Sequence, residues 1–383
     1  MFQLSRSDLD TLLTLLRQRG YAVVGPTVRD RAVVYDEIES TRDLPEGWTD
    51  EQSAGRYRLA HGSNRALFGY VVGPHSWKRF LHPPALRLWR ATRSDRGDRG
   101  TVFEGEERTP RRFAFFGVRP CEIAAIARQD RVFLGGPFVE PTYRGNREGL
   151  FVVAVHCTEP KGSCFCTSMG TGPRAGGGFD IALTELLSDG REPTYLAEPG
   201  SDRGAELLAE LSPAEASAEL CARAEDEVSR ASERMGRSLA TDGLKEVLER
   251  SYESPRWAEV AKRCLSCANC TMVCPTCFCA NVEDTTDLAG ATAERWRRWD
   301  SCFTTDFSYL HGGAVRFSPE SRYRQWLVHK LGTWFDQFGT SGCVGCGRCI
   351  TWCPAAIDIT EEARALQSAD AKRRPRALGG ESA

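Results

Sequence analysis

An α/β (or α+β) domain followed by a helical domain is the fold class that the sequence predicts. Two apolar runs, 113–118 and 150–156, end at cysteine-bearing turns, and the first leads into a helix-like segment, an order typical of α/β domains. Over 201–263, apolar residues recur at helical spacing, and two cysteine motifs follow. The predicted parts are an α/β domain (1–200), a helical linker region (201–250), an α-helical cysteine-rich domain (251–366) and a disordered tail (367–383).

Periodicity and turn residues predict the elements of the first domain in order. An amphipathic helix is expected over 7–18, with Ser7 as its N-cap. A polar loop over 39–65 and a charged loop or hairpin over 92–112 interrupt the strands. The strands themselves are expected at 21–24, 32–38, 68–72, 113–118, 150–156 and 179–183.

Composition restricts the class of protein. The 383 residues are 41% hydrophobic and 27% charged, with a formal net charge of −2, which is ordinary for a soluble globular protein and does not favour nucleic acid as a partner. No stretch approaches the ~20 apolar residues of a membrane helix, and the first residues do not have the pattern of a secretory signal. We therefore expect a cytoplasmic protein with no membrane partner, in which sixteen reduced cysteines indicate metal ligation.

Two copies of one cysteine motif lie in the second domain. Eleven of the sixteen cysteines fall between Cys264 and Cys353, so their distribution is uneven. In each copy, three cysteines are separated by two residues, and a fourth follows after three residues, directly before a proline. Three thiolates at this spacing can wrap one face of a [4Fe–4S] cluster. The copies are Cys264, Cys267, Cys270 and Cys274, and Cys343, Cys346, Cys349 and Cys353.

The fourth ligand of each cluster must come from elsewhere in the chain. In two-cluster ferredoxins, the cysteine before the proline ligates the other cluster. A structural zinc site, which pairs two C-x2-C knuckles, fits this pattern less well. The 68 residues between the motifs have helical spacing from Ser321 onward, which favours an α-helical ferredoxin-type arrangement. The predicted ligand sets are Cys264, Cys267, Cys270 and Cys353, and Cys343, Cys346, Cys349 and Cys274.

Four cysteines of the first domain form a candidate third site. Two of them follow predicted strands, where ligands are common in α/β domains. Their number matches one further [4Fe–4S] cluster or one zinc ion, while buried free thiols are the alternative. A G-x-G-x-x-A run at 170–175 is not a dinucleotide fingerprint, because it follows no strand and contains a proline. The four are Cys121, Cys157, Cys164 and Cys166.

Other notable residues have less definite roles. Cys277, Cys279 and Cys302 can act beside a cluster, as substitute ligands or as packed free thiols, whereas Cys221 is expected in the core. Basic and aromatic residues are interleaved at 296–299 and at 322–326, which favours shielding of a cluster or a subunit interface over binding of nucleic acid. No catalytic set of residues is evident, so the sequence predicts an electron conduit.

Long stretches also resemble a known family. FFGVRPCEIAAI, HCTEPKGSCFCTSMGTGP and SGCVGCGRCITWCPAAIDIT, within residues 70–365, resemble the β (iron–sulfur) subunit of cytoplasmic [NiFe] hydrogenases of the sulfhydrogenase type. The A subunit of anaerobic sulfite reductase is similar but less close. The resemblance implies that the eight motif cysteines are cluster ligands, and it supports the third set.

The same resemblance implies a role in a larger assembly. It implies a non-catalytic electron-transfer subunit of a heterotetramer, between the hydrogenase small and large subunits and a flavin- and NAD(P)-binding subunit. An electron-transfer subunit of an anaerobic sulfite or polysulfide reductase is the alternative.

Overall fold

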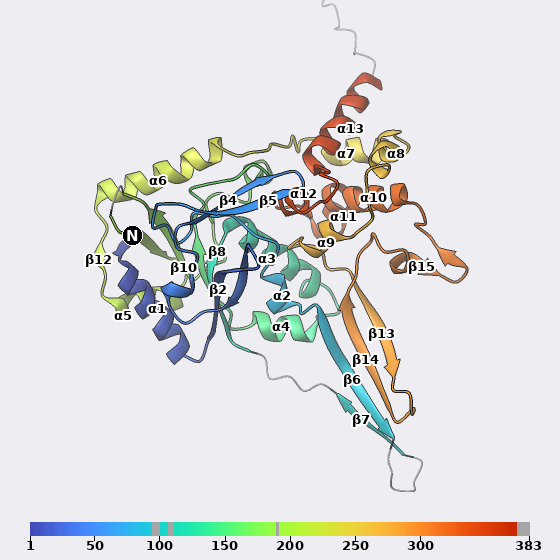
Figure 1. Cartoon of the computed structure of the whole chain (residues 1–383), viewed down its shortest axis with the longest axis horizontal. Helices are drawn as coiled ribbons and strands as arrows, with labels where there is room; N and C mark the ends of the chain where they lie inside the picture. Colours follow the sequence, from blue (N-terminus) through green and yellow to red (C-terminus); the bar gives the residue numbers. More distant parts are fainter. Residues whose placement is uncertain (94–99, 106–110, 189–190, 374–383) are drawn as a thin grey trace, which may run out of the picture.

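A central eight-stranded sheet organises the N-terminal part of the chain (Figure 1). The structure is a computed structural model that describes residues 1–93, 100–105, 111–188 and 191–373. The strand order is β12-β1-β11-β10-β9-β8-β2-β3, in which β10, β9, β8 and β2 are parallel neighbours and the remaining pairs are antiparallel. The strands are β1 (Phe2–Leu4), β2 (Ala22–Arg29), β3 (Ala32–Glu37), β8 (Phe113–Val118), β9 (Phe151–Val155), β10 (Ile181–Leu186), β11 (Thr194–Pro199) and β12 (Ala214–Glu215).

Helices cover both faces of this sheet. The leucines of α1 and α5 pack on one face against Phe116 and Val153, and residues of α2, α3 and α4 pack on the other against Phe115 and Val152. Alternate residues of β8 and β9 thus enter two cores, which explains why both strands are apolar throughout. The mixed α/β class is confirmed. The helices are α1 (Arg6–Gln18), α2 (Lys78–Leu81), α3 (Pro120–Phe133), α4 (Pro141–Arg147), α5 (Asp202–Leu211) and, beside β10 and β11, α6 (Ala218–Glu233).

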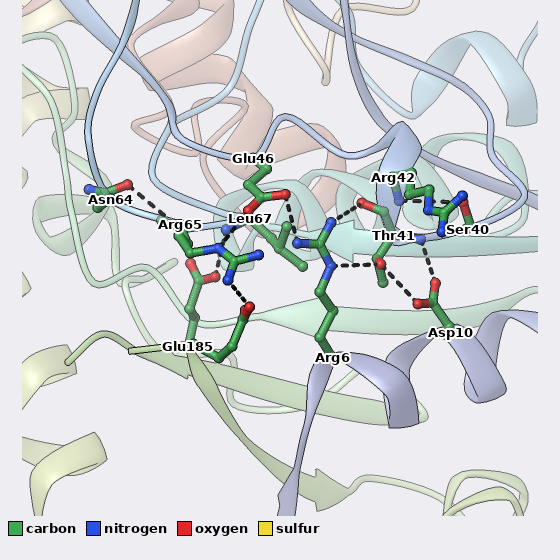
Figure 2. Close-up of polar contacts among 12 residues, drawn as sticks. Arg6, Asp10, Ser40, Thr41, Arg42, Glu46, Asn64, Arg65, Leu67 and Glu185 are labelled. Carbon is green, nitrogen blue, oxygen red and sulfur yellow. Dashed lines mark hydrogen bonds and ion pairs between the residues drawn. The ribbon is translucent and has the colours of Figure 1, made fainter. Parts of the chain in front are cut away.

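The start of α1 is fastened to the segment that follows β3 (Figure 2). The N-cap is Ser5 and the prediction of Ser7 is wrong, because the Ser5 side chain accepts from the Asp8 N–H in a capping box. Figure 2 shows Arg6 directed at Glu46, with 2.6 Å between Nη1 and Oε2, and Asp10 accepting from the Thr41 N–H at 2.7 Å. These contacts fasten the chain segment that follows β3. Part of this segment lines one of the pockets described below.

That connection differs from the prediction in two ways. A hairpin, β4 (Trp48–Ser53) and β5 (Arg56–His61), occupies the predicted polar loop. The predicted strand at 68–72 is wrong, although the segment is buried. Side chains take the place of a strand partner there. Glu185 accepts from the Leu67 N–H at 2.7 Å, and both residues are labelled in Figure 2. Glu185 also accepts from the Phe68 N–H at 3.0 Å, and Arg119 donates to the Phe68 carbonyl at 2.6 Å.

The C-terminal part is built mainly of helices around its own core. Trp257, Trp326 and Leu331 are among the buried residues of this core. The last helix continues to Arg373, so the predicted disordered tail is wrong for 367–373, and 374–383 lie outside the described residues. The helices are α7 (Leu244–Arg250), α8 (Arg256–Ala261), α9 (Asn269–Met272), α10 (Pro319–Val328), the π-helix η4 (His329–Thr333), α11 (Trp334–Phe338), α12 (Arg348–Thr351) and α13 (Ile359–Arg373).

The insertion between the motifs also contains strands, which the helical prediction missed. β13 (Ala280–Thr286) and β14 (Thr292–Trp299) form a hairpin that pairs with β6 (Ala85–Arg93) of the N-terminal part. β7 (Thr101–Gly105) completes a four-stranded sheet that projects from the rest of the chain at the lower right (Figure 1). Of the loop or hairpin predicted over 92–112, residues 92–93 and 101–105 lie in these paired strands, and residues 94–99 and 106–110 lie outside the described residues. No helix among the described residues is long and apolar enough to cross a membrane.

Candidate metal centres

The two cysteine motifs follow the same backbone path. Directly before the second cysteines, Ser266 and Gly345 have φ of 52° and 66°. Directly after the second cysteines, Ala268 and Gly347 have φ of 65° and 75°, and a short helix then carries the third cysteine. A left-handed conformation costs serine or alanine roughly 1 kcal/mol and is retained mainly where function requires it. The shared path indicates that both loops wrap the same kind of group.

A backbone amide points at the first sulfur of each motif. The Ser266 N–H donates to Cys264 Sγ at 3.5 Å, and the Gly345 N–H donates to Cys343 Sγ at 3.4 Å. The donors belong to the residues whose left-handed conformation was just described. Because such hydrogen bonds favour the thiolate and help set the potential of an iron–sulfur cluster, these loops suit one.

Site 1 is a pocket to which both motifs contribute. Its lining includes the three spaced cysteines of the first motif and Cys353, whose Sγ also accepts from the Ile357 N–H at 3.4 Å. About 410 Å³ of empty space, with solvent at the mouth included, lies between the lining atoms. Phe303, Tyr323 and Trp326 supply apolar walls that limit access of water. We define site 1 as Cys264, Cys267, Cys270 and Cys353.

Site 2 combines the second motif with the last cysteine of the first. Besides burial, a negative charge at Cys274 raises the pKa of each of the three spaced cysteines of the second motif, so Cys274 lies near all three. Burial raises the pKa of Cys343 to about 11, whereas a hydrogen bond from the Cys277 thiol and the nearby Lys330 ammonium lower the pKa of Cys274. A thiolate is therefore favoured at Cys274. We define site 2 as Cys274, Cys343, Cys346 and Cys349.

Site 3 lies at the edge where β8 and β9 end. Because these neighbouring strands are parallel, the turns after them bring Cys121 and Cys157 to the same edge, beside Cys164 and Cys166. The four thiols line one pocket with about 360 Å³ of empty space, with solvent at the mouth included. Burial raises the pKa of Cys164 to about 12, so a free thiol there is neutral. We define site 3 as Cys121, Cys157, Cys164 and Cys166.

The three sites follow one another through shared walls. Cys349 of site 2 also lines the pocket of site 1, and Cys346 of site 2 also lines the pocket of site 3. The Phe165 N–H donates to the Gly345 carbonyl at 2.9 Å, which joins the loops of sites 2 and 3 directly. Site 2 is therefore the middle member of a continuous row.

The arrangement of the thiols bears on the choice between zinc and a cluster. Within the described residues, no three His, Cys, Asp or Glu side chains converge on one point as ligands of a single ion would. A zinc ion needs thiolates about 2.3 Å from its centre. The thiols of sites 1 and 3 surround pockets instead, which fits a four-iron cluster better than a single ion.

Three other cysteines form contacts of their own. The Cys277 thiol is within hydrogen-bonding reach of Cys274, and Cys279 is within reach of Cys302. The Asp300 N–H donates to the Cys279 carbonyl at 2.9 Å and holds these two segments together. Cys221 is half-buried on α6, so its predicted place in the core is only partly correct.

Buried cationic side chains beside the sites, among them Lys330 and Arg348, were not predicted from the sequence. Lys330 Nζ lies 3.2 Å from Cys274 Sγ. The sequence indicates such a residue only by placing a lysine at an apolar position of the helical pattern after Ser321. Arg348 follows Gly347 in the second motif and forms a buried ion pair with Glu122 of α3, with 2.5 Å between Nη2 and Oε1. That pair joins sites 2 and 3, and no pattern in the sequence predicts a partner 226 residues away.

Comparisons with known proteins agree with this geometry. Residues 263–357, which contain both motifs and the insertion, match a family model described as a 4Fe-4S dicluster domain. The chain is 37% identical over 251 residues to Sulfhydrogenase 2 subunit beta of Pyrococcus furiosus, and the alignment covers 64% of this chain and 72% of that protein. No solved structure matches the chain. The assignment of individual cysteines as ligands stays a prediction.

Proposed function

Because this chain belongs to the family of the sulfhydrogenase beta subunits, we propose that it connects a [NiFe] hydrogenase module to a flavin- and NAD(P)-binding subunit. It is an iron–sulfur subunit that serves electron transfer. In our proposal, three [4Fe–4S] clusters occupy sites 1, 2 and 3, and the chain works in the cytoplasm. The hydrogenase small subunit would dock at one end of the row and the flavin-containing subunit at the other.

One observation carries this proposal: the three four-cysteine sites form a row with shared walls. Each bound cluster would supply one-electron transfer. The chain's own residues bind through the thiolates, donate amide hydrogen bonds to sulfur, and exclude water with the apolar walls of site 1. Such a row supports passage of electrons between two surfaces of the chain, and the hydrogenase alternative is favoured over a sulfite reductase by the named relative.

Affinity purification of the tagged chain from its own organism tests the proposal. We expect the hydrogenase large and small subunits and a flavin-containing subunit to co-purify, and the complex to reduce NAD(P) with H2. Replacing Cys349 with alanine should abolish this reaction but preserve H2-dependent reduction of a dye at the hydrogenase module. A Cys221→Ala variant, changed at a half-buried thiol outside the sites, should keep both activities.

Two results would count against the proposal. Co-purification with subunits of a sulfite or polysulfide reductase, and with no hydrogenase subunit, would move the chain to another complex. Full H2-dependent reduction of NAD(P) by the Cys349→Ala variant would show that electrons bypass site 2.

A further inference from the structure

Lys330 is a buried ammonium group with an unusual set of neighbours. It lies in the π-helix η4 and is 4% exposed. Its Nζ donates to Cys274 Sγ at 3.2 Å, to Thr276 Oγ1 at 3.1 Å and to the Gly342 carbonyl at 3.4 Å. All three neighbours belong to the two cysteine motifs or directly adjoin them. The lysine therefore contacts site 2 and both chain segments that form it.

The charge of this lysine needs a negative partner. A buried charge is costly unless it is paired. In the described parts of the chain, no carboxylate lies within ion-pair distance of Lys330, and the group that its Nζ contacts instead is Cys274 Sγ, at 3.2 Å. The ammonium is thus matched to a thiolate. A four-thiolate [4Fe–4S] cluster at site 2, which carries net negative charge, provides that partner.

Neighbouring hydrogen bonds fix the direction of the lysine. The Thr276 hydroxyl donates to the Gly342 carbonyl at 2.6 Å, so its oxygen is free to accept from Lys330. The single π turn that carries Lys330 is of a kind found frequently at functional sites. The ammonium is held in place from two sides and does not depend on solvent.

Site 1 differs from site 2 in this respect. Its described lining contains apolar, aromatic and uncharged polar side chains and no charged one. The nearest lysine in sequence is Lys262, which is exposed and therefore screened by water. Adding an electron to a cluster increases its negative charge, so a buried cation in contact with one of its sulfurs favours reduction.

We propose that Lys330 holds the reduction potential of the cluster at site 2 above that of the cluster at site 1. This inference rests on the proposed function, because it assumes clusters at both sites. It assigns Lys330 a positioning role for charge: an electron that enters the row at site 1 is drawn to the cluster at site 2. The lysine acts through Cys274 and does not itself bind iron.

Redox titration of the purified full-length chain with its clusters, followed by electron paramagnetic resonance, tests the inference. A Lys330→Met variant should show one midpoint potential shifted to a more negative value, with the other potentials and the iron content unchanged. A Lys330→Arg variant, which keeps the positive charge, should restore most of the shift. As matched control, Lys262→Met removes a charge at an exposed position two residues from Cys264 and should leave every potential unchanged.

Unchanged potentials in a fully loaded Lys330→Met variant would overturn the inference. If that variant does not retain its iron, Lys330→Gln decides, because glutamine keeps a neutral donor in the same place. A loaded Lys330→Gln variant with a lowered potential supports the inference. Loss of iron in both variants means that the lysine only holds the site together, which also overturns it. A wild-type chain that binds no iron would instead refute the proposed function.

Discussion

Cys279 and Cys302 are a pair of thiols that belongs to none of the three sites. Hydrogen bonds from the Cys302 side chain and backbone, together with the charges of Lys330 and Lys78, lower the pKa of Cys279 to about 7. The same contact raises the pKa of Cys302 well above its usual value. Both residues are half-buried. One thiol of the pair is therefore expected to react as a thiolate near neutral pH.

Alkylation as a function of pH tests this assignment at Cys279. A lowered pKa means that the thiolate is absent well below pH 7 and fully present above it. The rate of modification by iodoacetamide should therefore rise from pH 6 to pH 8 and then level off, as measured by mass spectrometry of peptides. Cys302 serves as the internal control and should react more slowly at each pH. Equal rates for the two thiols would contradict the prediction.

Only some residues of the candidate sites could be predicted from the sequence. The eight cysteines of the two motifs stand out in the sequence because their spacing is local, whereas Cys121 and Cys157 were grouped only because each follows a predicted strand; the role of all twelve as ligands stays a prediction. Lys330 was hidden because it occupies an apolar position of a helix, and only the folded chain reveals that Cys274 lies beside it. Contacts between distant segments carry no local pattern in a single sequence.

Among the elements, the loop before α12 packs closely against the loop of site 3. A Cβ atom placed on Gly347 would lie 2.4 Å from the Ser163 carbonyl oxygen, and one on Gly345 would lie 2.6 Å from the Phe165 carbonyl carbon. Both obstacles are backbone atoms, which cannot rotate away. The glycines of the second motif are thus required by packing as well as by their positive φ.

A Gly347→Ala substitution separates these two requirements. Ala268 occupies the matching position of the first motif with φ of 65°, so that backbone angle is compatible with an alanine. We expect Gly347→Ala to destabilise the loaded chain by about 1–3 kcal/mol, as overpacking does, and to lower its melting temperature in circular dichroism. The matched reverse change, Ala268→Gly, should stabilise the chain by no more than about 1 kcal/mol, because glycine adopts a positive φ without strain. A gain in Ala268→Gly as large as the loss in Gly347→Ala would point to the φ angle and away from the contact with Ser163.

Prediction of the elements succeeded where periodicity decides the structure. β8, β9 and α3 agree with their predicted segments because each is buried on the faces that its apolar residues indicate. Residues 68–72 have the composition of a strand, but Glu185 and Arg119 satisfy their backbone groups instead. β14 pairs with β6, a strand from the other part of the chain, and so its arginines and tryptophans resembled an isolated interface motif.

For the whole molecule, the number of clusters is the property that distinguishes the structural interpretations. Three sites of four thiols require about 12 iron atoms per chain, and the two motifs alone require about 8. We expect the anaerobically purified chain to contain the larger number and a Cys164→Ala/Cys166→Ala variant to lose about four irons. Iron and acid-labile sulfide assays measure both.

The iron content of a second variant serves as the control. Cys221→Ala changes a half-buried thiol on α6 and should retain all of the iron. A wild-type chain with about 8 irons, together with a double variant that has the same number, would remove site 3 from the row. The domain boundaries near residues 200 and 250 stay a prediction, although α5 and α6 both pack on the N-terminal sheet.

The four-stranded sheet has a consequence for how a cell makes this chain. Thr92 on β6 pairs with Thr292 on β14, so the partner of β6 leaves the ribosome 200 residues later. At roughly 5–20 residues per second, β6 waits on the order of 10–40 s with an open edge. Site 1 waits as well, since Cys353 is translated after every other cysteine of the three sites. If site 1 holds a cluster as proposed, its complete set of four thiolates exists only after Cys353 has been translated, so delivery of iron to this site must follow that step.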